Sequence, residues 1–153
     1  MFDKRSAQVE ILRNMFNAKR RPAWFEIDGK IAITTNGFYA YIFDSDEVFI
    51  NLAKMQKVDY NMKSDSITPD HKLHLTKVVY ERNPGMTQRV FVCQGGERVV
   101  VNEDFLRQFK NCEFYGDGAL SPVFCTDGLS GLCGVILPIR SPSDLVEREL
   151  NPA

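Results

Sequence analysis

Apolar residues near the N-terminus recur at the spacing of an amphipathic helix. Between residues 6 and 19 they fall on one side of a helix, and polar residues fall on the other. Asp3 or Ser6 has a side chain suited to capping the first turn, and Pro22 ends the pattern. We therefore predict a helix over residues 6–19. Its apolar face would comprise Val9, Ile11, Leu12, Met15, Phe16 and Ala18.

Three short apolar runs follow, separated by tight-turn dipeptides. Asp28-Gly29 and Asn36-Gly37 are strong hairpin signals, because primed turns need positive φ. The aromatic side chains of these runs are expected in the core, with stacking on single-stranded nucleic acid as the other interpretation. The predicted strands are Trp24–Ile27, Lys30–Thr35 and Phe38–Phe43.

The C-terminal half repeats this order of helix and three-strand meander. Asn102 is a good N-cap, and Phe105, Leu106 and Phe109 give the short helix after it an apolar face. The shared order indicates an internal duplication, although the residues themselves differ. The strands predicted after this helix are 112–115, 122–126 and 132–139.

The remaining segments complete an α+β pattern, because strands outnumber helices and no βαβ repetition is present. Residues 48–55 suit either a short helix or a strand, and residues 61–70 form a polar loop. We predict one domain over residues 1–140 and a tail over 141–153, with residues 144–150 as a last helical turn or a loose segment. The other predicted strands are 72–81 and 88–93, paired around Asn83-Pro84-Gly85, and 98–101.

Composition and charge narrow the classes of function. The chain has 153 residues, 44% hydrophobic and 25% charged, with a formal net charge of -1, so it is not a polycation. Residues 1–30 nevertheless hold seven Lys or Arg against four acids. These cations either complement the helix dipole or form a patch for phosphate groups. The candidate DNA-binding residues on the two helices are Arg13, Lys19, Arg20, Arg21, Arg107 and Lys110.

Targeting and redox signals favour the cytoplasm. The N-terminus shows no apolar signal core, and no apolar run approaches the roughly 20 residues of a membrane span. Cys93, Cys112, Cys125 and Cys133 lack CxxC spacing, so we expect reduced and mostly buried thiols.

No constellation in the sequence favours catalysis, a metal or a cofactor. His71 and His74 would point to opposite faces of a strand, which is poor geometry for a shared metal. Asp44, Asp46 and Glu47 are more typical of loop acids than of a cation site. Nucleotide-binding and nucleophile motifs are missing, so we expect a protein that is not an enzyme.

The C-terminal residues carry a family resemblance. Val101-Asn102, then Phe105-Leu106, then Ser121-Pro122-Val123 before a strand, and finally Gly134 followed by Val135-Ile136-Leu137-Pro138-Ile139-Arg140, resemble the last domain of the bacterial DNA polymerase sliding clamp, the β subunit. The resemblance covers residues 97–140. It implies a DNA-clamp-like domain built from two pseudo-repeated helix-plus-meander modules.

The resemblance also implies a function. In that family, helices line a ring around duplex DNA, and the final strand helps form a hydrophobic cleft for short linear motifs of replication and repair proteins. The corresponding peptide-groove residues here are Val135, Ile136, Leu137, Pro138, Ile139 and Arg140. The chain would then be a DNA-associated, protein-binding platform of bacterial or phage-like type.

Two departures from the family pattern keep an alternative open. Family chains hold three such domains and this chain has length for one, so a ring would require a homo-oligomer. The family chain stops after the arginine, whereas this one continues for thirteen residues that could cover the groove. The alternative is a single-domain interaction module with the same fold, no ring and no DNA role.

Overall fold

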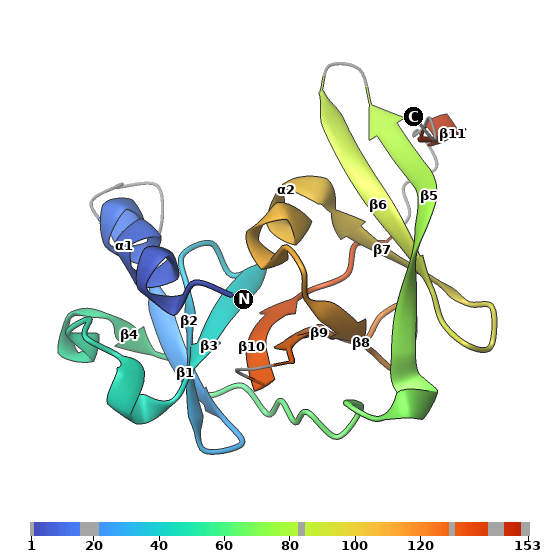
Figure 1. Cartoon of the computed structure of the whole chain (residues 1–153). Coiled ribbons are helices and arrows are strands. Elements are labelled where there is room, and N and C mark those ends of the chain that lie inside the picture. Colours follow the sequence, from blue (N-terminus) through green and yellow to red (C-terminus); the bar gives the residue numbers. More distant parts are fainter. Residues whose placement is uncertain (1, 16–21, 83–84, 129–130, 141–145, 151–153) are drawn as a thin grey trace.

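The computed structural model describes residues 2–15, 22–82, 85–128, 131–140 and 146–150. These residues form an α+β domain with one large, mostly antiparallel, eleven-stranded sheet and two short α-helices, which confirms the predicted class (Figure 1). None of the described helices is long and apolar enough to cross a membrane.

The first module follows the predicted order of a helix and a meander. Its elements are α1 (Lys4–Met15), β1 (Ala23–Ile27), β2 (Lys30–Thr34) and β3 (Tyr39–Phe43). Asp3 caps α1, because its carboxylate accepts hydrogen bonds from the Ser6 N–H at 3.0 Å and the Ser6 hydroxyl at 2.8 Å. Ile11 is buried as predicted, but Val9 is 40% exposed and lies off the packed face. Residues 16–19 of the predicted helix lie outside the described residues.

The second module repeats that order, after a connection of short elements and a hairpin. Asn102 caps α2, since its side-chain oxygen accepts the Asp104 N–H at 2.8 Å. Its elements are α2 (Glu103–Leu106), the 3₁₀ turn η4 (Arg107–Phe109), β8 (Glu113–Tyr115), β9 (Val123–Asp127) and β10 (Gly131–Ile136).

The two meanders join through their last strands. β3 and β10 pair antiparallel, with Ala40 opposite Val135. The central sheet therefore runs β1-β2-β3-β10-β9-β8. The third strands of the two modules meet at its centre, and the first strand of each module lies at an end. An antiparallel pair has a local twofold axis between its strands, so the two modules face each other across that axis.

Strands outside this central sheet extend it at both ends. The polar loop expected at residues 61–70 is largely irregular, and the hairpin around residues 83–85 is present as β5 and β6. The start of β5 pairs with β8, and the rest pairs with β6 after a register shift between Leu75 and Val79. The additional elements are η1 (Ser45–Glu47), η2 (Leu52–Lys54), β4 (Gln56–Lys57), η3 (Pro69–His71), β5 (Lys72–Arg82), β6 (Met86–Val92), β7 (Arg98–Asn102) and β11 (Val146–Glu149).

Two predictions about the C-terminal part are wrong. Residues 146–149 form neither a helical turn nor a loose segment, because β11 pairs antiparallel with β5. The strand predicted over 132–139 ends at Ile136, two residues before Pro138, which has no N–H to continue a ladder.

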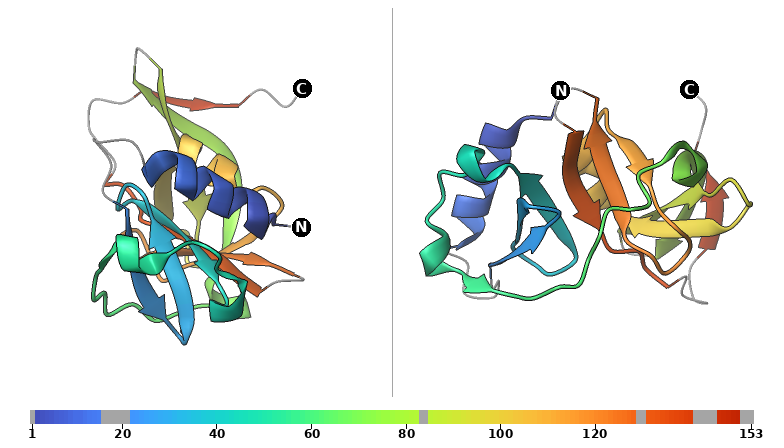
Figure 2. Two further views of the ribbon diagram at one scale, coloured as in Figure 1. Left: turned by 90° about the vertical axis from the view of Figure 1, so that its left-hand side faces the viewer. Right: turned by 90° about the horizontal axis from the view of Figure 1, so that it is seen from below.

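Each face of the central sheet is covered by different parts of the chain. On one face, α1 and α2 pack over a core that includes Ile11, Tyr41 and Phe109. On the other, a smaller core around Phe25 and Val135 is covered by the connection from residue 58 to residue 67. Figure 2 shows this connection crossing the sheet on the side away from the helices.

Candidate functional site

The segment after β10 links two distant parts of the sheet. The Leu137 N–H donates to the carbonyl of Phe38, next to β3, at 2.8 Å. The Ile139 N–H donates to the carbonyl of Val100 in β7 at 2.7 Å. Pro138 lies between these two bonds, where its missing N–H costs nothing. The chain from Leu137 to Ile139 is therefore fixed without being a strand.

An apolar cavity of about 470 Å³ opens beside this segment. Its floor is the sheet face away from the helices, at Phe25, Ala40 and Val135. Its walls are Phe38 and Leu137 on one side and the connecting segment 60–63 on the other. Among the described residues that line it, Lys63 is the charged one. This composition suits an apolar ligand held by few polar contacts.

The cavity rim carries large apolar side chains that contact solvent. Phe38 is 58% exposed, Tyr60 47% and Leu137 38%. Tyr60 is positioned by an edge-to-face contact with Phe25, whose ring centre is 4.9 Å away. The connection that carries Tyr60 is anchored at Val58, whose N–H donates to the Trp24 carbonyl at 2.9 Å. Exposed aromatic residues gathered at one cavity are typical of a binding surface.

The six predicted groove residues separate in the structure. Val135 and Leu137 line the cavity. Ile136 belongs to the core on the helix side. Pro138 and Ile139 are half-buried and Arg140 is exposed, and these three lie outside the cavity lining.

Several residues that line the cavity were not predicted from the sequence. Phe38 was expected in the core, but its side chain is exposed because it follows the Asn36-Gly37 turn and precedes β3. Tyr60 and Met62 lie in a segment without hydrophobic periodicity, so no pattern pointed to them. The available signal was an aromatic residue, Tyr60, directly before the predicted polar loop.

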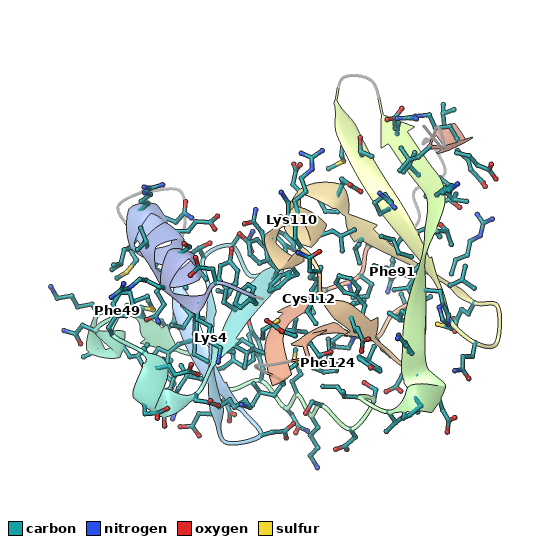
Figure 3. The ribbon with its side chains drawn as sticks, in the orientation of Figure 1. Lys4, Phe49, Phe91, Lys110, Cys112 and Phe124 are labelled. Atoms are coloured by element: carbon teal, nitrogen blue, oxygen red, sulfur yellow. The ribbon has the colours of Figure 1, made fainter. Side chains whose placement is uncertain are left out.

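The candidate DNA-binding residues that the structure describes are exposed. Arg13 lies on α1, and Arg107 and Lys110 lie on or beside η4. Lys19, Arg20 and Arg21 lie outside the described residues. Figure 3 shows Lys110 beside α2, at the helix side of the molecule. Arg107 forms an ion pair with Asp104 at 3.3 Å, so its charge is partly neutralised.

A polar cavity of about 210 Å³ lies between α1 and η4. It is lined by cations and acids together, including Arg107, Lys110, Asp3 and Glu10. At its base the Tyr41 hydroxyl donates to Glu10 at 2.8 Å and lies 3.1 Å from Gln108 Oε1. Burial raises the pKa of Tyr41, so this hydroxyl stays protonated and connects α1, the sheet and η4.

The acidic group Asp44, Asp46 and Glu47 follows β3. Its carboxylates lie within 4.8 Å of one another. Glu47 accepts hydrogen bonds from Lys4 at 2.7 and 2.9 Å, and Asp44 binds Lys30. The Lys30 ammonium holds the pKa of Asp44 below its ordinary value. These ion pairs attach the loop to α1 and β2 and give Asp44 and Glu47 a structural role that needs no metal ion.

The histidines lie apart from both cavities. His71 lies between Thr68, whose hydroxyl is 2.7 Å from Nδ1, and Asp117, whose carboxylate is 3.1 Å from Nε2. These contacts hold η3 against the turn after β8. His74 is exposed on β5.

Comparisons with known proteins add no relative. No protein-family model, no curated protein and no solved structure matches the chain.

Proposed function

We propose that the chain is a non-enzymatic, sliding-clamp-like protein that acts as a DNA-associated platform for binding partner proteins. Its primary activity would be the capture of a short linear peptide in the apolar cavity beside β10. The single observation that carries this proposal is the cavity of about 470 Å³ with Val135 in its floor and Leu137 in its wall. Both residues belong to the segment that the clamp resemblance marks as a peptide groove.

Two features of the fold support a clamp-like domain. The paired meanders give the central sheet a twofold arrangement, which suits a duplicated helix-plus-meander unit. The helices lie on one face of the sheet and the apolar cavity opens on the other. A partner peptide bound there would not compete with anything bound along the helices.

The cavity itself favours an extended apolar peptide. It is open to solvent at Phe38, Tyr60 and Leu137, so a chain could lie across it and insert one or two large side chains. Burying two such side chains contributes about 3–6 kcal/mol, so micromolar binding, which needs about 8 kcal/mol, also requires further contacts along the peptide.

A peptide-display selection tests this activity. The immobilised protein is offered a library of random short peptides, and enriched sequences are measured by calorimetry. We expect enriched peptides to carry Leu, Met or Phe anchors. Leu137→Asp should abolish their binding, because it places a charge in the apolar wall. Leu75→Asp is the matched control, since Leu75 is 46% exposed on β5 and outside the cavity lining.

Two outcomes would overturn the peptide-binding proposal. One is a selection with no enrichment over the uncoated surface. The other is equal loss of binding in the Leu137→Asp and Leu75→Asp variants, with both proteins folded by circular dichroism.

The DNA role is tested separately. Exposed Arg13, Arg107 and Lys110 on the helix side support it. A fluorescent duplex should bind at low salt, and its affinity should fall as salt rises. The expected slope of log K against log salt is about −0.9 for each phosphate that the protein neutralises. The triple alanine variant should bind less tightly and with a smaller slope. If the wild type binds no duplex at low salt, the alternative holds: an interaction module with no DNA role.

The molecular mass in solution tests whether the protein forms a ring. Light scattering over a range of protein concentrations should show a closed homo-oligomer if one chain supplies one domain of a clamp. A monomer at every concentration would exclude encirclement of DNA and leave peptide binding untouched.

A further inference from the structure

Two cysteines that are 21 positions apart in the chain meet inside the second module. The Sγ atoms of Cys112 and Cys133 are 3.5 Å apart. Cys133 is fully buried in β10, and Cys112 is half-buried just before β8. Figure 3 shows Cys112 near the middle of the molecule, close to Lys110. Their pairing could not be predicted from the sequence, because no spacing motif connects them.

The backbone at both positions can move without breaking strand pairing. A disulfide has an S–S length of about 2.05 Å, so the two sulfurs must approach by roughly 1.5 Å. Cys112 precedes the first residue of β8 and follows Asn111, which has a positive φ of 62°. Cys133 occupies the register shift between Leu132 and Gly134 in the β9–β10 pair. A shift or bulge is a place where one residue is already outside the regular ladder.

The two thiols have different chemical character. Cys133 can donate its S–H to the Cys112 sulfur or to the Cys125 carbonyl, 3.4 Å away. The hydrogen bond from Cys133 lowers the pKa of Cys112, whereas the same bond and burial raise the pKa of Cys133. Cys112 is therefore the partner that ionises first, and its sulfur is the one that a small oxidant can reach.

Neither Cys93 nor Cys125 combines an accessible sulfur with a lowered pKa. Cys125 is fully buried, and burial raises its pKa. The pKa of Cys93 is raised by desolvation and by the nearby charges of Glu97 and Asp117. A raised pKa leaves little thiolate at neutral pH, so both should react slowly.

We propose that Cys112 and Cys133 are a redox modification site that forms a reversible intramolecular disulfide with a peroxide as oxidant. The Cys112 thiolate attacks one peroxide oxygen, the O–O bond breaks, and the leaving hydroxide takes a proton to become water. The resulting sulfenic acid is attacked by the Cys133 sulfur, which loses its proton. The S–S bond forms, the S–O bond breaks, and a second water leaves. Two thiols and one peroxide thus give one disulfide and two waters. The site does not depend on the proposed peptide or DNA binding.

Peptide mapping of the oxidised protein tests the pairing. The folded full chain is treated with a small excess of hydrogen peroxide, quenched, and labelled with a maleimide after denaturation. Of the four thiols, two should stop reacting, and the mass should fall by two hydrogen atoms. Trypsin is unsuitable, because no Lys or Arg lies between Lys110 and Arg140. Cleavage before Asp117 and Asp127 puts Cys112, Cys125 and Cys133 on separate peptides.

We expect one linked pair, joining the Cys112 peptide to the Cys133 peptide, and its disappearance after dithiothreitol. Cys112→Ser should abolish the link, and Cys93→Ser, the other half-buried cysteine, should leave it unchanged. Cys112→Ser changes a half-buried side chain and should fold even if substitution of buried Cys133 does not.

Three results would overturn the proposal. The first is a protein that keeps four reactive thiols under conditions where free cysteine is oxidised. The second is a link to Cys125 or between molecules instead of within one. The third is a wild type in which Cys112 proceeds to sulfinic acid without any disulfide.

Discussion

Gly134 is the position where a single methyl group should damage the fold most. A Cβ atom at this residue would lie 2.0 Å from Cε1 and 2.4 Å from Cζ of Phe109. Phe109 cannot easily move away, because it is 1% exposed and its ring centre is 5.7 Å from that of Phe2 and 5.5 Å from that of Tyr41. The close approach of η4 to β10 therefore requires glycine at 134.

The magnitude follows from the overlap. Extra methylene groups in a packed core usually cost about 1–3 kcal/mol, and a clash with ring carbons of a fully buried aromatic should reach the upper end. We expect Gly134→Ala to lose about 3 kcal/mol of unfolding free energy. That is a large part of the roughly 5–15 kcal/mol typical of a domain.

Urea denaturation, followed by circular dichroism and by fluorescence of the single tryptophan, Trp24, measures the loss. Gly95→Ala is the control, because no heavy atom lies within 4 Å of its Cβ position and its φ is ordinary. The control should change stability by less than about 0.5 kcal/mol. A Gly134→Ala variant as stable as Gly95→Ala would refute the packing of Phe109 on β10.

A double-mutant cycle shows whether Phe109 is the cause. Phe109→Leu removes the ring carbons that meet the new methyl group and has its own cost in lost contacts. In that background, alanine at position 134 should cost at least about 1 kcal/mol less than in the wild type. Additive losses would place the damage of Gly134→Ala elsewhere in the backbone.

Further predictions concern caps, acids and the last strand. Asn102→Ala removes the N-cap of α2 and should cost about 1 kcal/mol in urea denaturation; no change would mean that the cap is replaced by water. Hydrogen bonds from the Ser64 hydroxyl and N–H hold the pKa of Asp28 below its ordinary value. The contribution of Asp28 to stability should therefore be present at neutral pH and be lost as the pH falls through that lowered pKa. Asp28→Asn should flatten this part of the curve of unfolding free energy against pH. An identical curve would count against the hydrogen bonds between Ser64 and Asp28. Arg148→Ala breaks the ion pair of β11 with Glu81 at 2.5 Å, but both side chains are exposed, so the urea midpoint should hardly move; a large shift would mean that β11 is integral to the fold.

Much of the fold could be predicted from local signals. Asp28-Gly29 and Asn36-Gly37 specify hairpins by turn chemistry alone, and the first meander has its strands where these turns require. The N-cap of α2 could also be predicted, because an asparagine directly precedes residues with helical apolar spacing. By contrast, no local pattern could reveal that β11 pairs with β5, since Val146–Glu149 is fully exposed and has no alternating apolar face.

The candidate site was also predictable only in part, because some of its contacts join segments that are distant in the sequence. Val135 and Leu137 were found through a strand-like motif, and both line the apolar cavity. The opposite wall comes from residues 60–63, which reach the cavity because the connection crosses the sheet. Likewise, the contact between Cys112 and Cys133 depends on a register shift in β10 that no turn signal announces.

The cavity arises where the twofold arrangement of the two modules breaks down. β3 and β10 are equivalent strands, yet the chain leaves them differently. After β3 it turns into η1, where Glu47 bonds Lys4 on the helix side. After β10 it continues past Phe38 toward β7 and leaves Leu137 partly exposed beside Val135.

This asymmetry separates the residues that support the fold from those that can bind. Substitutions at buried positions of the β3–β10 pair that lie outside the cavity, such as Gly134 and Tyr41, should change stability first. Substitutions at Phe38 and Leu137, which lie where the modules differ, should change binding with little effect on stability, because their side chains already contact water. The shared order of elements in the two modules therefore accounts for the central sheet, whereas Phe38, Leu137 and residues 60–63 form the walls of the cavity.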